Sequence, residues 1–422
     1  MNSSNYVFEG CDTVALARKY GTPLYLMSEK FIRERLGEIK KDFLGAHPNT
    51  FAVFASKAFQ TLDILRIVKE EGIGLDVVSG GELFAAMKAG FPAERVFFHG
   101  NSKTLEELTM AVELGVGRVV VDNLYELRAL DALARERGKR VPILFRVAPG
   151  VDSHTHKFIS TGGLDSKFGI PLDPSVRDSY LREALEAKGL ELKGFHFHVG
   201  SQLHENDSHL KAIEVVMGLM REAKEKFGFE AEDFNVGGGF GVRYTDSDEP
   251  KPLSYFTDAM MSLIKRLAAR DGLRMPRVII EPGRWIVGEA GITLYTIGSI
   301  KEIPGIRTYV GVDGGLPDNP RPALYGAKYE AVVANKADRP RDRLVTVAGK
   351  CCESGDILIT DIKLANPESG DILAVFTTGA YNHSMASNYN RLPRPAVVMV
   401  SEGEDRLSVK RETYEDLVSR EL

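Results

Sequence analysis

From about residue 50 to residue 281 the chain alternates short β-rich runs with helical patterns, and this alternation constrains its fold more than any other feature. Amphipathic stretches such as Thr61–Glu71 and Leu210–Phe227 separate the runs. Strands that alternate with helices form parallel βα units. Eight units over roughly 230 residues match the size of a TIM-like (β/α)8 barrel. The expected strands are Phe51–Ala55, Ile73–Val78, Arg95–His99, Arg118–Asp122, Pro142–Val147, Lys193–Val199, Asp233–Val236 and Arg277–Glu281.

The sequence after Arg284 has short strands, Gly/Pro turns and little helical period, which predicts a C-terminal β domain, either a barrel or a sandwich. We expect the apolar run Leu24–Met27 to add a strand to it. The predicted division is an N-terminal segment over 1–30 that packs on the β domain, the barrel over 31–282 and the β domain over 283–422. Its expected strands are Gly291–Ile300, Arg307–Asp313, Leu344–Val347, Ile372–Thr377 and Ala396–Val400.

Composition excludes several classes of protein. Hydrophobic residues make up 43% of the 422 and charged residues 27%, as in soluble globular proteins. A net charge of -5 without a Lys/Arg stripe argues against a nucleic-acid partner. Met1–Tyr6 does not read as a signal peptide, and no apolar run approaches the ~18 residues of a membrane span. With only Cys11 and the adjacent Cys351 and Cys352, we expect no disulfide, no metal site and a reducing, cytoplasmic setting.

A lysine follows the first expected barrel strand, where active sites of such barrels form. A lysine that follows a strand is usually solvated, but Lys57 is also well placed for a pocket. There a desolvated amine can lose its proton and attack a carbonyl. Lys57 is therefore a candidate for a desolvated nucleophile in a pocket, and the rest of the chain must decide between the two interpretations.

The other strand ends are also polar. The glycine run Gly237–Gly241 is either a flexible turn or an anion cradle, and the loops after strands 7 and 8 of barrels are a frequent phosphate site. His196 and His198 share a strand face, so periodicity does not choose between them. Glu281 ends an apolar run and needs a partner, which Arg284 could supply.

Taken together, these residue types match the parts of a site for pyridoxal 5'-phosphate (PLP). The glycines would cradle the phosphate, the lysine would bind the aldehyde carbon, the glutamate would meet the ring nitrogen and a histidine would stack on the ring.

The predicted β domain carries polar clusters of its own. The loop Asp318–Tyr325 contains Arg321, which can clamp a carboxylate through two parallel hydrogen bonds. Cys351–Asp356 places a thiol beside two carboxylates, and Gly379–Tyr381 opens a loop rich in Ser and Asn. These groups suit a small, charged, carboxylated substrate.

The motifs resemble those of the diaminopimelate decarboxylase family, within the alanine-racemase-like (fold-type III) class of PLP enzymes, over nearly the whole chain. They are Phe54–Ala58, His154–Gly162 with Ser166–Gly169, His196–Gln202, Gly237–Gly241, Glu281–Arg284, Asp318–Gly326, Cys352–Asp356 and Gly379–Asn390. Departures are few: Phe54 stands where tyrosine is common, Leu316 where methionine is common, and Asn382-His383 is bulkier than usual.

The resemblance implies a function and a set of site residues. The reaction would be PLP-dependent decarboxylation of meso-2,6-diaminopimelate to L-lysine and CO2, the last step of lysine biosynthesis. Lys57 would hold PLP, His198 would stack on its ring and Cys352 would donate the proton. Further cofactor contacts would come from Gly237, Gly238, Gly239, Glu281, Pro282, Gly283, Arg284 and Tyr381. Substrate would be bound by Arg284, Arg321, Tyr325, Glu353 and Tyr381.

The resemblance also implies a homodimer with shared active sites, because Cys352 and Glu353 would reach the neighbouring subunit. Three alternatives stay open. A related decarboxylase would act on ornithine, lysine or a carboxylated polyamine, although the loop with Arg321 argues against it. A racemase of the class and a non-catalytic binding protein fit the retained catalytic groups less well.

Overall fold

The computed structural model describes residues 5–151 and 166–422. The chain divides into two compact units. The barrel unit comprises Arg35–Gly241 and Pro250–Trp285, and the β unit comprises the chain up to Glu34, Val242–Glu249 and Ile286–Leu422.

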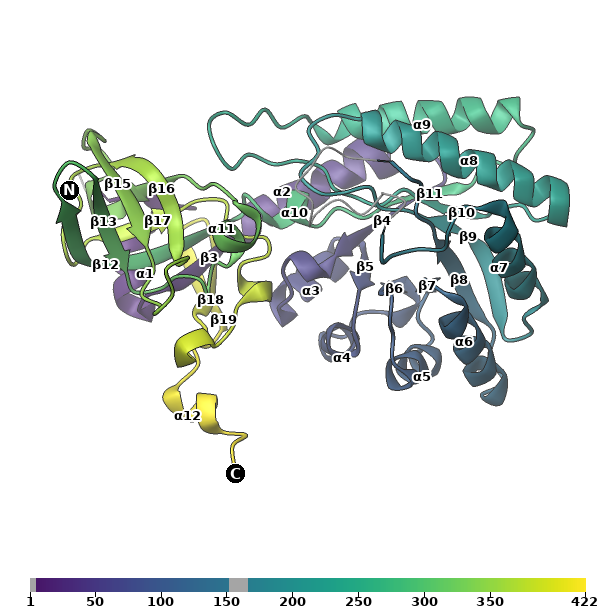
Figure 1. Ribbon diagram of the computed structural model, residues 1–422, viewed down its shortest axis with the longest axis horizontal. Coiled ribbons are helices and arrows are strands. Elements are labelled where there is room, and N and C mark those ends of the chain that lie inside the picture. The colour runs from purple at the N-terminus through teal and green to yellow at the C-terminus, as the bar shows by residue number, and fades with distance from the viewer. Residues whose placement is uncertain (1–4, 152–165) are drawn as a thin grey trace. The chain divides into compact units, whose positions relative to one another are not determined.

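Eight parallel strands close the barrel, in the order β10-β11-β4-β5-β6-β7-β8-β9. All eight strands expected from the sequence are present, with ends that differ by up to three residues, and the predicted fold class is confirmed. Figure 1 shows the helices outside the ring of strands. The strands are β4 (Thr50–Ala55), β5 (Gly74–Val77), β6 (Val96–Phe98), β7 (Arg118–Val121), β8 (Val141–Arg146), β9 (Leu190–His196), β10 (Asp233–Asn235) and β11 (Arg277–Ile280).

Side-chain caps fix where several barrel helices begin. Ser79, Thr104 and Asn123 accept hydrogen bonds from the first turns of α4, α5 and α6, so each helix starts at a polar residue of the loop that follows a strand. The helices are α2 (Glu29–Ile39), α3 (Leu62–Glu70), α4 (Gly80–Lys88), α5 (Leu105–Leu114), α6 (Leu124–Glu136), α7 (Pro174–Glu186), α8 (Asp207–Phe227), α9 (Leu253–Arg270) and α10 (Arg284–Val287). No helix of the described chain is both long enough and apolar enough to cross a membrane.

The β unit is built on a nine-stranded sheet, whose main path runs β16-β15-β13-β12-β3-β18-β19. The run expected at Leu24–Met27 is strand β3, between β12 and β18. Strands β1 and β2 form a separate two-stranded sheet. The strands of the whole β unit are β1 (Val7–Phe8), β2 (Cys11–Asp12), β3 (Leu24–Ser28), β12 (Gly291–Ile303), β13 (Arg307–Val312), β14 (Ala331–Val333), β15 (Arg343–Ala348), β16 (Ile357–Leu364), β17 (Ile372–Val375), β18 (Ala396–Ser401) and β19 (Glu404–Val409). Its helices are α1 (Thr13–Tyr20), α11 (Arg321–Tyr325) and α12 (Tyr414–Val418).

Strand β16 was not expected from the sequence because a bulge breaks its alternation. Thr360 and Asp361 are both exposed although they are adjacent, and Asp361 has a φ of 54°. The pairing of β16 with β15 shifts register twice. Such a shift moves the following residues to the other face, so the apolar period of two is lost. Strands β1, β2, β14 and β19 were also missed.

Candidate active site

Lys57 lies in a short 3-10 turn directly after β4. Its neighbours Ser56 and Ala58 are buried, and the hydroxyl of Ser56 donates to the carbonyl oxygen of Asp76 at 2.7 Å. Lys57 itself is exposed. The expectation of a desolvated amine is therefore wrong for this chain, because the turn is anchored through Ser56 while the next side chain projects to solvent.

The positive charge of Lys57 acts on three groups, Asp76, Glu82 and His198. Glu82 accepts a hydrogen bond from Val78 N at 2.7 Å. Burial, reinforced by the carboxylate of Asp76, raises the pKa of Glu82 to about 7. Glu82 was not predicted as a site residue, although Ser79 followed three residues later by a glutamate is a recognisable helix-start signal. Two carboxyl groups, those of Asp76 and Glu82, are thus close enough for the charge of the lysine to act against the burial that raises their pKa values.

Glu281 is the centre of a buried polar cluster at the end of β11. Its carboxylate receives Asn235 Nδ2 at 2.6 Å and His196 Nε2 at 3.1 Å, and His99 Nε2 lies 2.7 Å away. Burial opposes the charge, but His99 and His196 lower the pKa of Glu281 well below its ordinary value. The partner of Glu281 is this cluster rather than Arg284, and the carboxylate stays ionised.

The structure separates the two histidines that periodicity could not. Strand β9 ends at His196, which is buried against Glu281, whereas His198 lies in the following loop and is half-buried. Burial, and then the charges of Lys57 and Arg146, lower the pKa of His198 well below its ordinary value. Its Nδ1 accepts a hydrogen bond from Gly238 N at 3.4 Å. His198 is therefore a neutral, flat ring beside the lysine.

The glycine run after β10 requires glycine for steric reasons. A Cβ on Gly238 would lie 2.1 Å from the carbonyl oxygen of Glu281, and Gly239 has a φ of 96°. The carbonyl of Gly238 faces Nε2 of His209 on α8 at 2.9 Å. Because a trans peptide points its C=O and N–H in opposite directions, this bond fixes the direction of the Gly239 N–H. Within 5–151 and 166–422, that N–H has no acceptor.

The turn Pro282-Gly283-Arg284 follows β11 and lies beside β4. A Cβ on Gly283 would lie 2.9 Å from the carbonyl oxygen of Ala55, so the turn approaches the strand that carries Lys57. Arg284 is buried and donates to the hydroxyl of Ser201 through Nη2 at 3.1 Å. The predicted cofactor contacts of the barrel unit therefore come from neighbouring strand ends.

In the β unit, Arg321 opens helix α11 and is 6% exposed. Its Nη1 donates to the hydroxyl oxygen of Tyr329 at 2.6 Å, and its guanidinium lies 4.8 Å from the ring centre of Tyr244. Burial opposes the charge, but the oxygens of Tyr244 and Tyr329 raise the pKa of Arg321, so it stays cationic. Its Nε is buried without a partner in the described structure. An unpaired buried donor of this kind is suited to an anion.

Tyr381 and Tyr325 belong to the same unit. Tyr381 has a φ of 61°, an uncommon conformation for tyrosine, and its hydroxyl is among the groups that raise the pKa of Arg321. Tyr325 ends α11 and is half-buried. Burial lowers the pKa of His383 to about 4, and its ring lies edge-on to Tyr25. His383 is therefore uncharged near neutral pH.

Cys352 and Glu353 are exposed, in contrast to Arg321. Their loop is held by the buried Asp356, whose carboxylate accepts from Leu316 N at 2.7 Å and from Cys351 N at 2.9 Å. Burial and the carboxylate of Asp356 raise the pKa of the Cys351 thiol to about 12. All three cysteines are free. The two adjacent cysteines thus differ, since only Cys352 is fully open to its surroundings.

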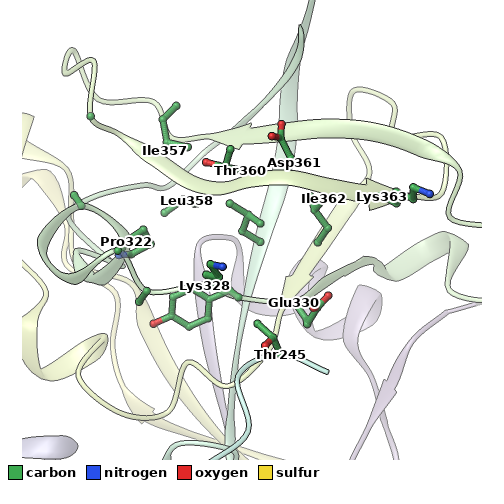
Figure 2. Close-up of a pocket in the computed structure, with 16 residues that line it drawn as sticks. Thr245, Pro322, Lys328, Glu330, Ile357, Leu358, Thr360, Asp361, Ile362 and Lys363 are labelled. Atoms are coloured by element: carbon green, nitrogen blue, oxygen red, sulfur yellow. The ribbon is translucent and has the colours of Figure 1, made fainter. Parts of the chain in front are cut away.

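A pocket of about 610 Å³ lies between the end of α11 and strand β16 (Figure 2). Its walls include Pro322, Lys328, Glu330, Asp361 and Lys363, so both signs of charge face it. Arg321 does not line this pocket. The motif His154–Gly162 lies outside the described residues, whereas Ser166–Gly169 lies within them.

Comparison with known proteins gives a consistent result. Residues 30–288 match the family model "Pyridoxal-dependent decarboxylase, pyridoxal binding domain". The chain is 49% identical over 413 residues to the diaminopimelate decarboxylase of Bacillus subtilis, covering 98% of this chain and 94% of that protein. The chain belongs to the diaminopimelate decarboxylase family. The resemblance expected from the motifs is thereby confirmed.

Solved structures of the diaminopimelate decarboxylase family have the same fold. The enzyme from M. jannaschii in complex with L-lysine is 35% identical with a TM-score of 0.93, over 100% of this chain and 97% of that one. The enzyme from Helicobacter pylori, also complexed with L-lysine, is 30% identical with a TM-score of 0.87, over 96% and 98% of the two chains.

The residues of the barrel unit fit PLP, the cofactor of this family of pyridoxal-dependent decarboxylases. Glu281 is a buried, ionised carboxylate that can accept from a protonated ring nitrogen. The Gly239 N–H has no acceptor within the described chain and can donate to a phosphate oxygen. Lys57 offers an exposed amine next to the neutral ring of His198.

Proposed function

We propose that this member of the diaminopimelate decarboxylase family converts meso-2,6-diaminopimelate to L-lysine and CO2, the last step of lysine biosynthesis. The assignment of this substrate depends on Arg321, a buried cation whose Nε has no partner in the described structure. A substrate with an amine alone at its far end would leave this donor unpaired, which is costly. Diaminopimelate has a carboxylate there.

The barrel unit would hold the cofactor. Lys57 would bind the aldehyde carbon, and His198 would stack on the ring. Further contacts to the cofactor would come from Gly237, Gly238, Gly239, Pro282, Gly283, Arg284 and Tyr381, with the glycines cradling the phosphate. When bound, PLP supplies an electron sink for the electron pair that remains at Cα after CO2 departs. Glu281 would keep the ring nitrogen protonated, since its own charge is maintained by His99 and His196.

The far end of the substrate would be bound by charged side chains. Arg284 and Arg321 would bind the distal carboxylate, and Glu353 would pair with the distal ammonium. Tyr325 and Tyr381 would complete this binding site. Cys352 would return a proton to Cα, and its thiol can act as a general acid.

We further propose a cytoplasmic homodimer with shared active sites. The exposure of Cys352 and Glu353 supports an arrangement in which both side chains act in the site of a neighbouring subunit. The three free cysteines suit a reducing compartment.

The test is release of CO2 by the PLP-loaded protein from meso-diaminopimelate, from its stereoisomers, from ornithine and from lysine. We expect the meso isomer to be decarboxylated with L-lysine as the product. Decarboxylation of ornithine or lysine at a comparable kcat/KM would favour the alternative of a related decarboxylase with another substrate.

A further inference from the structure

The guanidinium of Arg321 packs on the ring of Tyr244, but in the described structure its hydrogen bonding is one-sided. Nη1 donates to Tyr329 at 2.6 Å, whereas the buried Nε has no partner in 5–151 and 166–422. In a guanidinium, the N–H of Nε and one N–H of Nη2 point in the same direction and form one edge of the fork. With Nη1 engaged, this Nε/Nη2 edge is the one left for a carboxylate, which it can bind through two parallel hydrogen bonds.

Tyr329 is itself fixed. It is 3% exposed and lies just before strand β14, which pairs with β17. Its ring meets the ring of Tyr244 edge-on at 5.5 Å and 83°. The side-chain amide of Asn382, which is fully buried, lies 3.5 Å from its hydroxyl oxygen. The acceptor of the Arg321 bond therefore cannot shift without repacking its surroundings.

We propose that Tyr329 is a positioning residue that sets the rotation of the Arg321 guanidinium, so that the Nε/Nη2 edge meets the distal carboxylate of the substrate. This inference rests on the proposed function, in which Arg321 binds that carboxylate. Tyr329 itself does not touch the substrate. Its hydrogen bond restricts the arginine side chain before the substrate binds, so less conformational entropy is lost on binding.

If Tyr329 acts in this way, its loss should weaken binding of the distal carboxylate and leave binding of the reacting end of the substrate unchanged. Decarboxylation removes the carboxylate at the reacting end, so L-lysine keeps the distal carboxylate, whereas 1,5-diaminopentane has none. Competitive inhibition of the PLP-loaded enzyme by these two amines therefore separates recognition of the distal carboxylate from all other binding.

The test is the variant Tyr329→Phe, which keeps the ring and removes the acceptor. We expect the inhibition constant of L-lysine and the KM of meso-diaminopimelate to rise about tenfold. The inhibition constant of 1,5-diaminopentane and kcat should stay within about twofold. The matched control is Tyr309→Phe on β13, a half-buried tyrosine without a contact to Arg321, for which all four constants should be unchanged.

A second measurement distinguishes positioning from general damage. The variant Arg321→Lys has no guanidinium to orient. Adding Tyr329→Phe to it should therefore raise the inhibition constant of L-lysine by less than about a further twofold. The proposal would be overturned if Tyr329→Phe raised the inhibition constants of L-lysine and 1,5-diaminopentane equally. It would also be overturned if the effects of Tyr329→Phe and Arg321→Lys on L-lysine binding were fully additive. A wild-type protein that releases no CO2 from diaminopimelate and is not inhibited by L-lysine would instead refute the proposed function.

Discussion

The Nε2 atom of His209 lies 2.9 Å from the carbonyl oxygen of Gly238, inside a closed packing of aromatic rings. His209 is fully buried and stacks on Phe240 with ring centres 5.6 Å apart. Burial lowers the pKa of His209, so it is neutral and donates this bond. The bond orients the Gly238–Gly239 peptide, and with it the N–H that is open to a phosphate.

Replacing His209 with Phe should therefore weaken PLP binding without affecting the rest of the cofactor site. Phenylalanine keeps the stacking and loses the donor, and we expect about a fivefold loss of affinity for PLP in titrations of the cofactor-free protein. Pyridoxal, which lacks the phosphate, should bind as it does to the wild type. His209→Gln can still donate and should recover much of the loss. Equal loss for both vitamers would point to a packing defect.

Replacing Glu281 with Gln should lower the rate far more than the affinity for the cofactor. Glutamine keeps the size of the side chain, but it carries no charge to keep the ring nitrogen protonated. We expect kcat to fall about 10²- to 10³-fold with PLP still bound. The measurement is CO2 release at saturating PLP, and a variant within threefold of wild type would show that Glu281 has another role.

Glu82 should make the stability of the cofactor-free protein depend on pH. The pKa of Glu82 rises from 4.5 to about 7 on folding, so the folded state keeps a proton that the unfolded chain loses between these values. The contribution of Glu82 to the free energy of unfolding is therefore fully present below pH 4.5 and is lost as the pH rises through 7.

Urea unfolding measures this effect. Relative to Glu82→Gln, which does not titrate, the wild type should lose up to about 3 kcal/mol between pH 4.5 and pH 8. The control Glu106→Gln changes an exposed glutamate on α5 and should show no such trend. A stability difference between wild type and Glu82→Gln that is the same at both pH values would contradict the assignment.

Shared active sites can be tested by mixing two inactive variants. Lys57→Ala removes the proposed cofactor anchor, and Cys352→Ala removes the proposed proton donor. If Cys352 acts across a dimer, each mixed dimer contains one complete site, and an equal mixture should recover about a quarter of wild-type activity. No recovery after subunit exchange, with mixed dimers present, would place both residues in one subunit's site.

The sequence predicted the barrel well because its eight units repeat one physical pattern. Strand ends carry polar residues, so Lys57, Glu281 and the glycine run could be located before any geometry was known. His209 was missed because it lies on an amphipathic helix, where a polar residue has no special meaning. Glu82 was missed because its spacing from Ser79 indicates only the start of a helix. Their roles depend on which strand end the helix packs against.

Two other features depend on three-dimensional detail. Periodicity places His196 and His198 on one face only while the strand continues, and β9 ends between them. The exposure of Lys57 follows from a turn anchored by Ser56, a contact with Asp76 twenty residues away. Neither the end of a strand nor a contact across strands can be read from local spacing.

The proposed function requires that PLP binds covalently to Lys57. The direct test is borohydride reduction of the protein after incubation with excess PLP, followed by peptide mapping by mass spectrometry. We expect a phosphopyridoxyl group on the peptide that contains Lys57, and none in Lys57→Ala. Reduced protein that carries no such group, or carries it on another lysine, would show that Lys57 does not bind PLP.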